Sequence, residues 1–249
     1  MNVLLRGIQA VAVLAVLLAA LALTRADGQP GAAPTDGVAL AIVFDTSGSM
    51  KDPVPDGAGV MTAKYRIASR ALEAITRRLE AFASGATSGQ PRKIRASLIT
   101  FRGNSAFESI PFGEFKAEAF RRWVKEYSGP AGNTPLGSAV RLGAKSVLGS
   151  GLTHKHILVV TDGENTVSPD PATVIPKLRQ EALEKQTAVS FHFVAFDVDA
   201  RVFEPLKKMG ATVVGAADEK QLNTQIGLIL ERKILLEDEE PPAATGKKP

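Results

Sequence analysis

The chain has 249 residues, of which 45% are hydrophobic and 22% are charged, and these proportions are ordinary for a soluble fold with one sizeable α/β domain. The formal net charge of +4 is too small to indicate a nucleic-acid partner. Because the chain contains no cysteine, disulfide bonds, thiol catalysis and cysteine-based zinc sites are excluded.

The first predicted element is a targeting segment. Arg6 precedes an almost unbroken apolar stretch from Ile8 to Leu23, whose length suits a signal-peptide core. A membrane-spanning helix needs about 20 residues, so this stretch is short for one. We expect residues 1–26 to be either a cleaved signal peptide or an uncleaved N-terminal anchor that tethers the protein to a membrane through residues 8–23. Both alternatives predict an exported domain, in a bacterial periplasm or at the cell surface.

The next segments are a linker and one domain. Residues 27–36 are rich in Gly, Pro, Ala and Asp and predict a flexible linker, and the tail at 237–249 is expected to be disordered. Residues 37–236 alternate between strand and helix patterns, which predicts a doubly wound α/β fold with a mostly parallel six-stranded sheet and helices on both faces. The expected strands are 38–44, 93–101, 106–112, 155–161, 187–196 and 211–215. The expected helices are 61–83, 114–127, 136–148, 171–185, 202–209 and 218–236.

Two segments depart from this simple alternation. The strand at 106–112 follows the strand at 93–101 through a hairpin-like connection, so we expect it to be a short antiparallel edge strand. Residues 52–60 form an insert rich in Pro and Gly, which we expect to be a plain surface loop, although it could also shape specificity.

The predicted helices carry apolar residues three and four positions apart, which is typical of core-facing surfaces. In the helix at 114–127 several of these residues are aromatic, among them Trp123 and Tyr127. We expect this aromatic stripe to pack in the core, although such a stripe could also line a pocket. For the last helix, at 218–236, the expected buried face consists of Leu222, Ile226, Ile229 and Ile234.

Oxygen-bearing side chains follow two of the predicted central strands. Asp45, Ser47 and Ser49 come directly after the apolar run at 38–44, and a tight turn there would let the three side chains converge. Asp162 ends a second apolar run, and Thr134 lies in a Gly- and Pro-rich loop between the two strands. Because ligands bind at the carboxyl ends of strands in open α/β sheets, we expect these loops to form one site. Oxygen ligands without nitrogen or sulfur suit a hard divalent cation, Mg²⁺ or alternatively Mn²⁺ or Ca²⁺.

These three segments resemble the von Willebrand factor type A domain and its metal-ion-dependent adhesion site. The resemblance implies that Ser47, Ser49 and Thr134 offer hydroxyls to the metal, and that Asp45 and Asp162 act directly or through bound water. It also implies one open coordination position, which an acidic side chain of a protein partner fills. The donor chemistry agrees, because neutral hydroxyls leave the cation under-neutralised and able to attract an outside carboxylate.

The chain also departs from the pattern of this family. Some members carry paired acids after the first motif and build a second cation site, but here Met50 and Lys51 follow it. Lys51 would repel a second cation, so we expect a single metal site. The histidines suggest no zinc site: His154 and His156 share a face of one strand but need a further ligand, and His192 is expected to be a hydrogen-bonded sheet residue.

The expected function is that of an exported, non-enzymatic protein-binding module for adhesion or assembly, which holds an Asp or Glu side chain of its partner through the bound cation. The first alternative is a stable subunit of a membrane-associated assembly that holds an acidic loop permanently. The second is a metal-dependent phosphohydrolase, since an apolar strand ending in Asp45 also begins aspartate-nucleophile phosphatases. Those enzymes carry a second acid where this chain has Ser47, so we expect no catalytic residues and no organic cofactor.

Overall fold

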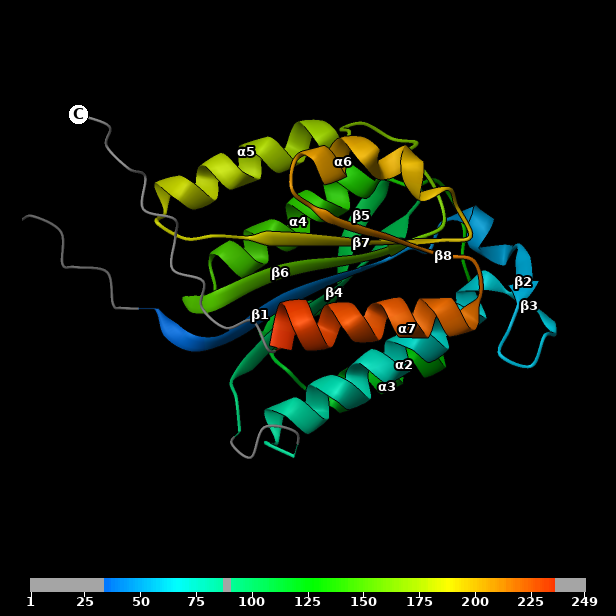
Figure 1. Ribbon diagram of the computed structural model, residues 1–249, viewed down its shortest axis with the longest axis horizontal. Helices are drawn as coiled ribbons and strands as arrows, with labels where there is room; N and C mark the ends of the chain where they lie inside the picture. Colours follow the sequence, from blue (N-terminus) through cyan, green and yellow to red (C-terminus); the bar gives the residue numbers. More distant parts are fainter. Residues whose placement is uncertain (1–33, 87–90, 236–249) are drawn as a thin grey trace, which may run out of the picture. The chain divides into compact units, whose positions relative to one another are not determined.

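The computed structural model describes residues 34–86 and 91–235. Its main sheet has six strands in the order β5-β4-β1-β6-β7-β8, and helices cover both faces (Figure 1). All neighbouring strands of this sheet are parallel except β5, which is antiparallel to β4. The strands are β1 (Thr35–Phe44), β4 (Ile94–Arg102), β5 (Ser105–Glu114), β6 (Leu152–Thr161), β7 (Ser190–Phe196) and β8 (Thr212–Ala216).

The helices form two layers. One face of the sheet is covered by α2 (Lys64–Ala83), α3 (Ala117–Glu126) and α7 (Glu219–Ile229), and the other by α4 (Leu136–Leu148), α5 (Pro171–Glu184) and α6 (Glu204–Lys208) (Figure 1). Short helical turns lie at η1 (Gly48–Lys51), η2 (Ala200–Phe203) and η3 (Leu230–Leu235), the last of which is a π-helical turn that continues α7. The predicted doubly wound α/β fold is therefore confirmed.

The central strand β1 presents side chains of different size to the two layers of helices. Large side chains such as Leu40 and Ile42 alternate with Ala39 and Ala41 along this strand, and all of them are fully buried. The large residues face α2 and α7, while the alanines face α4. On α4, a Cβ added at Gly143 would lie 2.9 Å from the Ala41 Cβ, so small residues on both elements permit their close contact.

Three predictions about the elements need correction. The insert at 52–60 is not a plain loop, because Pro53–Pro55 (β2) and Met61–Ala63 (β3) pair as a separate two-stranded antiparallel sheet. This pairing uses the backbone of residues 61–63, so α2 begins at Lys64 and not at residue 61 as predicted. The edge strand β5 is antiparallel as predicted, but it is not short: it has ten residues and pairs along most of β4.

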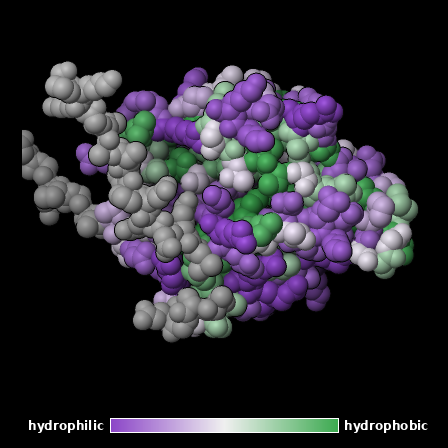
Figure 2. All heavy atoms as spheres, viewed as in Figure 1, coloured by the Kyte–Doolittle hydropathy of each residue, from purple (hydrophilic) through white to green (hydrophobic). Residues whose placement is uncertain are grey.

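The expected buried face of the last helix is confirmed, since Leu222, Ile226, Ile229 and Ile234 are each at most 3% exposed. Figure 2 shows the same side of the molecule as Figure 1, where α5 and α7 present mostly hydrophilic residues and hydrophobic residues are visible between them, over the edge strand β8.

In the part of the chain that the structure describes, no helix has the length and apolar character needed to span a membrane. The predicted targeting segment at 1–26, most of the predicted linker and the predicted tail at 237–249 lie outside the described residues.

The order of the strands determines where a ligand site can form. From β1 the chain crosses to β4 on one side, and it later returns to β6 on the other side of β1. The carboxyl ends of β1 and β6 therefore meet at the point where the strand order reverses, which is the usual position of ligand sites in open α/β sheets. The residues that follow these two strands include Asp45 and Asp162.

Candidate metal site

Asp45 lies at this edge because parallel pairing places the end of β1 beside the end of β6. Phe44 pairs with Val160 in the sheet, and the Asp45 backbone N–H donates a hydrogen bond of 3.0 Å to the Val160 carbonyl. The Thr161 hydroxyl donates to Asp45 Oδ2 at 2.5 Å. The Asp45 side chain is thus fixed by the neighbouring strand, and the residue is fully buried.

The turn after β1 folds back on the same carboxylate. The Ser47 backbone N–H donates to Asp45 Oδ1 at 2.7 Å, which turns the chain so that η1 begins at Gly48. The fully buried side chain of Met50 anchors this turn in the core. The hydroxyls of Ser47 and Ser49 lie 3.1 Å apart. The three side chains predicted to converge therefore do so within one turn.

Asp162 joins this group from the end of β6. The Ser49 hydroxyl donates to Asp162 Oδ1 at 2.8 Å, so the loops after β1 and β6 share a direct hydrogen bond across 113 positions of sequence. Asp162 is 6% exposed, whereas Ser49 lies at the surface. The cluster is therefore buried on the side of the sheet and open on the side of Ser49.

Thr134 reaches the same place from the loop before α4. Its backbone N–H donates to the Thr166 hydroxyl at 2.8 Å, and the Thr166 N–H donates to the Thr134 carbonyl at 3.0 Å. These bonds fix Thr134 against the loop after β6. A Cβ added at Gly163 would lie 3.9 Å from the Ser49 hydroxyl oxygen and 4.0 Å from that of Thr134, so both hydroxyls border one small space.

Backbone hydrogen bonds hold the loop before α4 against the turn after β1. The Gly48 N–H donates to the Gly132 carbonyl at 3.0 Å, and the Ala131 N–H donates to the Thr46 carbonyl at 2.9 Å. Gly132 has φ +87°, and an added Cβ would lie 3.0 Å from the Gly103 backbone, so a residue without a side chain is required here. The structure thus brings together all five residues that the sequence predicted for this site.

Electrostatics favour a cation between the two carboxylates. Burial, and next the nearby charge of Asp162, raise the pKa of Asp45 to about 6, although hydrogen bonds from Ser47 and Thr161 oppose the shift. Both effects penalise the ionised form, and a divalent cation would relieve both. Across the described residues no group of three or more His, Cys, Asp or Glu could hold a metal, so any ligand set here depends on the hydroxyls. Two carboxylates and three hydroxyls fit a hard cation such as Mg²⁺.

Lys64 is a member of the site that sequence analysis missed. It is only 4% exposed, and its Nζ lies 2.8 Å from Asp162 Oδ2 and 3.3 Å from Asp197 Oδ2. Burial lowers the pKa of Lys64, but the hydrogen bonds and charges of the two aspartates outweigh it and the net shift is upward. The signal that could have revealed Lys64 is its spacing, three positions before Ile67 on the buried stripe of α2.

A cavity of about 600 Å³ lies beside the cluster of the five predicted metal ligands, which is called the metal-ligand cluster below. The loop before α4 and Thr46 separate the two, while Trp123, Tyr127 and the half-exposed Phe107 line the cavity. Trp123 and Tyr127 stack with ring centroids 4.8 Å apart, and both pack edge-on against the buried Phe44. The aromatic stripe therefore packs in the core, as predicted, and also lines a cavity, which was the alternative.

The histidines lie away from this cluster. His156 and His192 are both nearly fully buried, with His156 Nδ1 at 3.3 Å from His192 Nε2. Burial lowers the pKa of both imidazoles, that of His192 to about 4. The prediction that His192 is a hydrogen-bonded sheet residue is confirmed.

A comparison with protein families gives a match to the von Willebrand factor type A domain over residues 39–226. The chain belongs to this family. Members of the von Willebrand factor type A family are mostly non-enzymatic modules for adhesion and interaction. A search of curated proteins found no match.

Several solved structures share the fold of this von Willebrand factor type A domain at low sequence identity. The PilB minor pilin from Streptococcus sanguinis is 17% identical with a TM-score of 0.57, and the match covers 82% of this chain and 62% of the pilin. An aerotolerance-related membrane protein from Bacteroides fragilis is 17% identical with a TM-score of 0.55, covering 77% of this chain and 99% of that protein. Proximal thread matrix protein 1 from the mussel byssus, described with zinc in its metal-ion-dependent adhesion site (MIDAS) motif, is 15% identical with a TM-score of 0.52. The match covers 78% of this chain and 47% of that protein.

Proposed function

We propose that this von Willebrand factor type A domain binds one divalent cation, Mg²⁺ or Mn²⁺, and through it an acidic side chain of a protein partner. Ser47, Ser49 and Thr134 would supply hydroxyl ligands, and Asp45 and Asp162 would act directly or through water. When bound, the cation supplies a Lewis-acidic position for a partner carboxylate. The observation that carries the proposal is the convergence of three loops on the space beside Gly163, which the hydroxyls of Ser49 and Thr134 both border.

The protein groups have separate tasks in this proposal. Asp45 accepts hydrogen bonds from Ser47 and Thr161 on its two oxygens, which fixes the orientation of the carboxylate before any ligand arrives. Lys64 holds Asp162 Oδ2 at 2.8 Å and leaves Oδ1 to face Ser49. Such preorganisation lowers the entropy lost on binding, because the ligand set need not be assembled by the metal.

The cavity lined by Trp123, Tyr127 and Phe107 gives this site a means of selecting its partner. It is separated from the metal-ligand cluster by Thr46 and the loop before α4, and its volume of about 600 Å³ could accept several side-chain atoms. We infer that residues next to the partner's Asp or Glu enter this cavity. Aromatic residues in desolvated pockets are the usual centres of binding energy at protein interfaces.

We further propose that the domain works outside the cytoplasm. The apolar stretch from Ile8 to Leu23 supports export, either as a cleaved signal or as a membrane tether. The fold similarity to a streptococcal pilin and to a Bacteroides membrane protein agrees with this location.

Isothermal titration of the full chain with MgCl₂ or MnCl₂ tests the metal site. We expect one site in the wild type and no detectable binding in Asp45→Asn, since the variant keeps the shape of the side chain but removes its charge. Asp199→Asn is the matched control, because Asp199 is a surface carboxylate paired with Arg201. Equal binding by wild type and Asp45→Asn would refute the assignment of these residues.

A pull-down with tagged wild type and Asp45→Asn, in Mg²⁺ and in EDTA, tests the partner. A protein captured only by the wild type in Mg²⁺ supports a carboxylate held through the metal. If a captured protein is released at once by EDTA, the complex is a reversible adhesion contact. If it is released only slowly, the alternative of a stable subunit in a membrane-associated assembly is favoured.

A further inference from the structure

A second cavity lies at the edge of the sheet opposite to Asp45 and Asp162. Its volume is about 370 Å³, and its walls come from α5, the amino ends of β7 and β8, and the η3 turn. Because the strands of this part of the sheet are parallel, their amino ends are the far edge from the metal-ligand cluster. The volume lies in the range of small-molecule sites.

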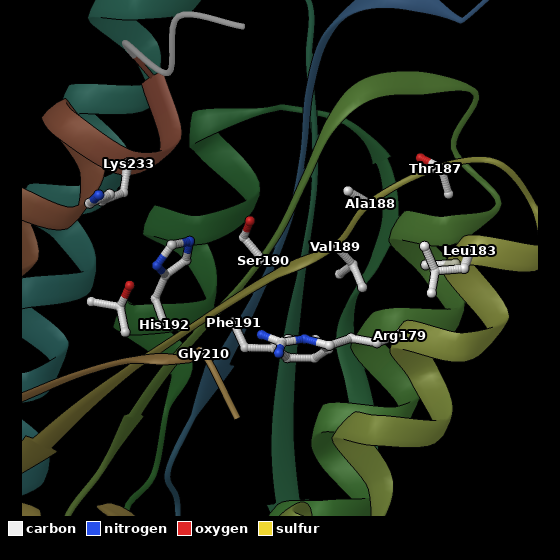
Figure 3. Close-up of a pocket in the computed structure, with 12 residues that line it drawn as sticks. Arg179, Leu183, Thr187, Ala188, Val189, Ser190, Phe191, His192, Gly210 and Lys233 are labelled. Carbon is white, nitrogen blue, oxygen red and sulfur yellow. The ribbon is translucent and has the colours of Figure 1, made fainter. Parts of the chain in front are cut away.

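The charged groups of this cavity are cationic. Arg179 and Lys233 both line it, and among its described lining residues none is acidic. Arg179 lies over the Phe191 ring with its guanidinium carbon 5.6 Å from the ring centroid, and it donates to the Met209 carbonyl. Burial lowers the pKa of Arg179, and within the described residues no carboxylate pairs with it. Figure 3 shows Arg179 extending from α5 across Phe191, with Lys233 on the other side of the cavity.

His192 adds a buried ring nitrogen, Nδ1, to the polar groups of this cavity. The residue is 3% exposed and lies between Lys233 and Ser190 in the close-up of the cavity (Figure 3). Its Nε2 contacts His156, but its Nδ1 has no hydrogen-bond partner among the described residues. Buried polar atoms are nearly always hydrogen-bonded, so an unpaired one that lines a cavity indicates a missing ligand or water. If His156 Nδ1 donates to His192 Nε2, the His192 proton lies on Nδ1 and can be donated to a bound anion.

We propose that this cavity binds a small molecule in which a phosphate group is attached to an apolar body. The planar guanidinium of Arg179 matches a phosphate in geometry, Lys233 supplies a second positive charge, and His192 supplies a neutral donor. Two cations and a donor suit a doubly charged oxyanion better than a single carboxylate. Apolar side chains such as Phe191 and Val189 form the rest of the wall and accept the body of the ligand.

The ligand can come from two sources that share this chemistry. One is a soluble phosphate monoester and the other is the phosphate monoester headgroup of a phospholipid such as phosphatidic acid. Phenyl phosphate and dihexanoyl phosphatidic acid, a water-soluble lipid whose phosphate is also a monoester, represent the two sources as probes. Both are titrated calorimetrically into the full chain in EDTA, which removes any contribution of the metal site.

Three variants locate the binding. Lys233→Met removes one cation of the cavity, and Arg232→Met is the matched control because Arg232 is an exposed cation on the same turn that does not line the cavity. Ala188→Trp places an indole at a lining position and keeps both cations. Arg179 is left intact, since its packing on Phe191 means that its loss could disturb the fold. Circular dichroism checks that each variant is folded.

We expect at least one probe to bind at a single site, with affinity reduced about tenfold by Lys233→Met, abolished by Ala188→Trp and unchanged by Arg232→Met. If only phenyl phosphate binds, the ligand is a soluble phosphate ester. If only the lipid binds, the ligand is a phospholipid. The proposal is overturned if neither probe binds at millimolar concentration. It is also overturned if Arg232→Met weakens binding as much as Lys233→Met, because the attraction would then be diffuse surface charge.

Discussion

Replacing Lys64 with Met should destabilise the metal-free protein strongly. The ammonium is 4% exposed and lies 2.8 Å from Asp162 Oδ2, whose side chain is fully buried. Removing one partner of a buried ion pair typically costs about 3–5 kcal/mol of folding free energy, because the other charge is left uncompensated. The side chain of Asp197, the second partner of Lys64, is 42% exposed, so leaving this carboxylate without its lysine costs less folding free energy. We therefore expect a loss near the lower end, about 3 kcal/mol in EDTA.

The same substitution should strengthen metal binding. Lys64 places a positive charge on a carboxylate that would also serve the cation, so its removal takes away a like charge from the metal site. We expect the dissociation constant for Mg²⁺ to fall about tenfold, which corresponds to about 1.4 kcal/mol. By linkage, the stability lost through Lys64→Met must then be smaller in saturating Mg²⁺ than in EDTA by the same amount.

Urea unfolding in EDTA and in saturating Mg²⁺, together with calorimetric titration, measures both sides of this cycle. Lys51→Met is the control, because Lys51 is an exposed lysine in the adjacent η1 turn and its charge is screened by solvent. Equal destabilisation by Lys64→Met in the two conditions, with an unchanged dissociation constant, would show that Lys64 has no electrostatic contact with the metal site.

Two further predictions concern chelation and pH. EDTA should leave the far-UV circular dichroism nearly unchanged and lower the melting temperature only by the binding linkage, because both hydrophobic layers are complete without the site; cooperative unfolding in EDTA would show a structural metal. The folded-state pKa of His192 is lowered to about 4, so the stability that this residue contributes is complete above its unfolded pKa of 6.5 and is lost as pH falls towards 4. The raised pKa of Asp45 makes stability rise as pH falls below about 6, which opposes this loss. The contribution of His192 is therefore measured as the difference in unfolding free energy between wild type and His192→Gln in urea, and this difference should change by about 3 kcal/mol between pH 7 and pH 4. Parallel pH profiles of the two proteins would contradict the prediction.

Much of the fold follows from local patterns. The apolar runs before Asp45 and Asp162 have no polar face, so each can be stable only as a central strand with helices on both sides. The spacing of Leu222, Ile226 and Ile229 likewise fixes the buried face of the last helix. The candidate ligands were predictable for the same reason, since parallel strands place their carboxyl ends at one edge of the sheet.

Other features depend on contacts between residues that are distant in sequence. The β2–β3 pair was not predicted, since β2 lies in a Pro- and Gly-rich insert and β3 lies in residues expected to be helical. Its pairing depends on which backbone groups meet and not on an apolar pattern. Lys64 belongs to the site only because the first turn of α2 packs beside Asp162, 98 positions later in the chain, and beside Asp197. The local sequence around a lysine on an apolar stripe does not identify its partner, because the carboxylates that make its burial favourable come from other loops.

The two cavities also depend on residues that are distant in sequence, so the sequence alone did not predict them. Trp123 and Tyr127 have the spacing of core residues and do pack on Phe44, yet their other surfaces line a cavity that only the loop before α4 completes. Arg179 and Lys233 are separated by 54 positions and line one cavity only because α5 and the η3 turn flank the same strand ends. The sequence by itself determined the strands, the core-facing helices and the candidate metal ligands, because these depend on periodicity and on strand ends. The tertiary structure decided which charges are paired and which are left facing a cavity, because electrostatic partners are chosen by distance in space.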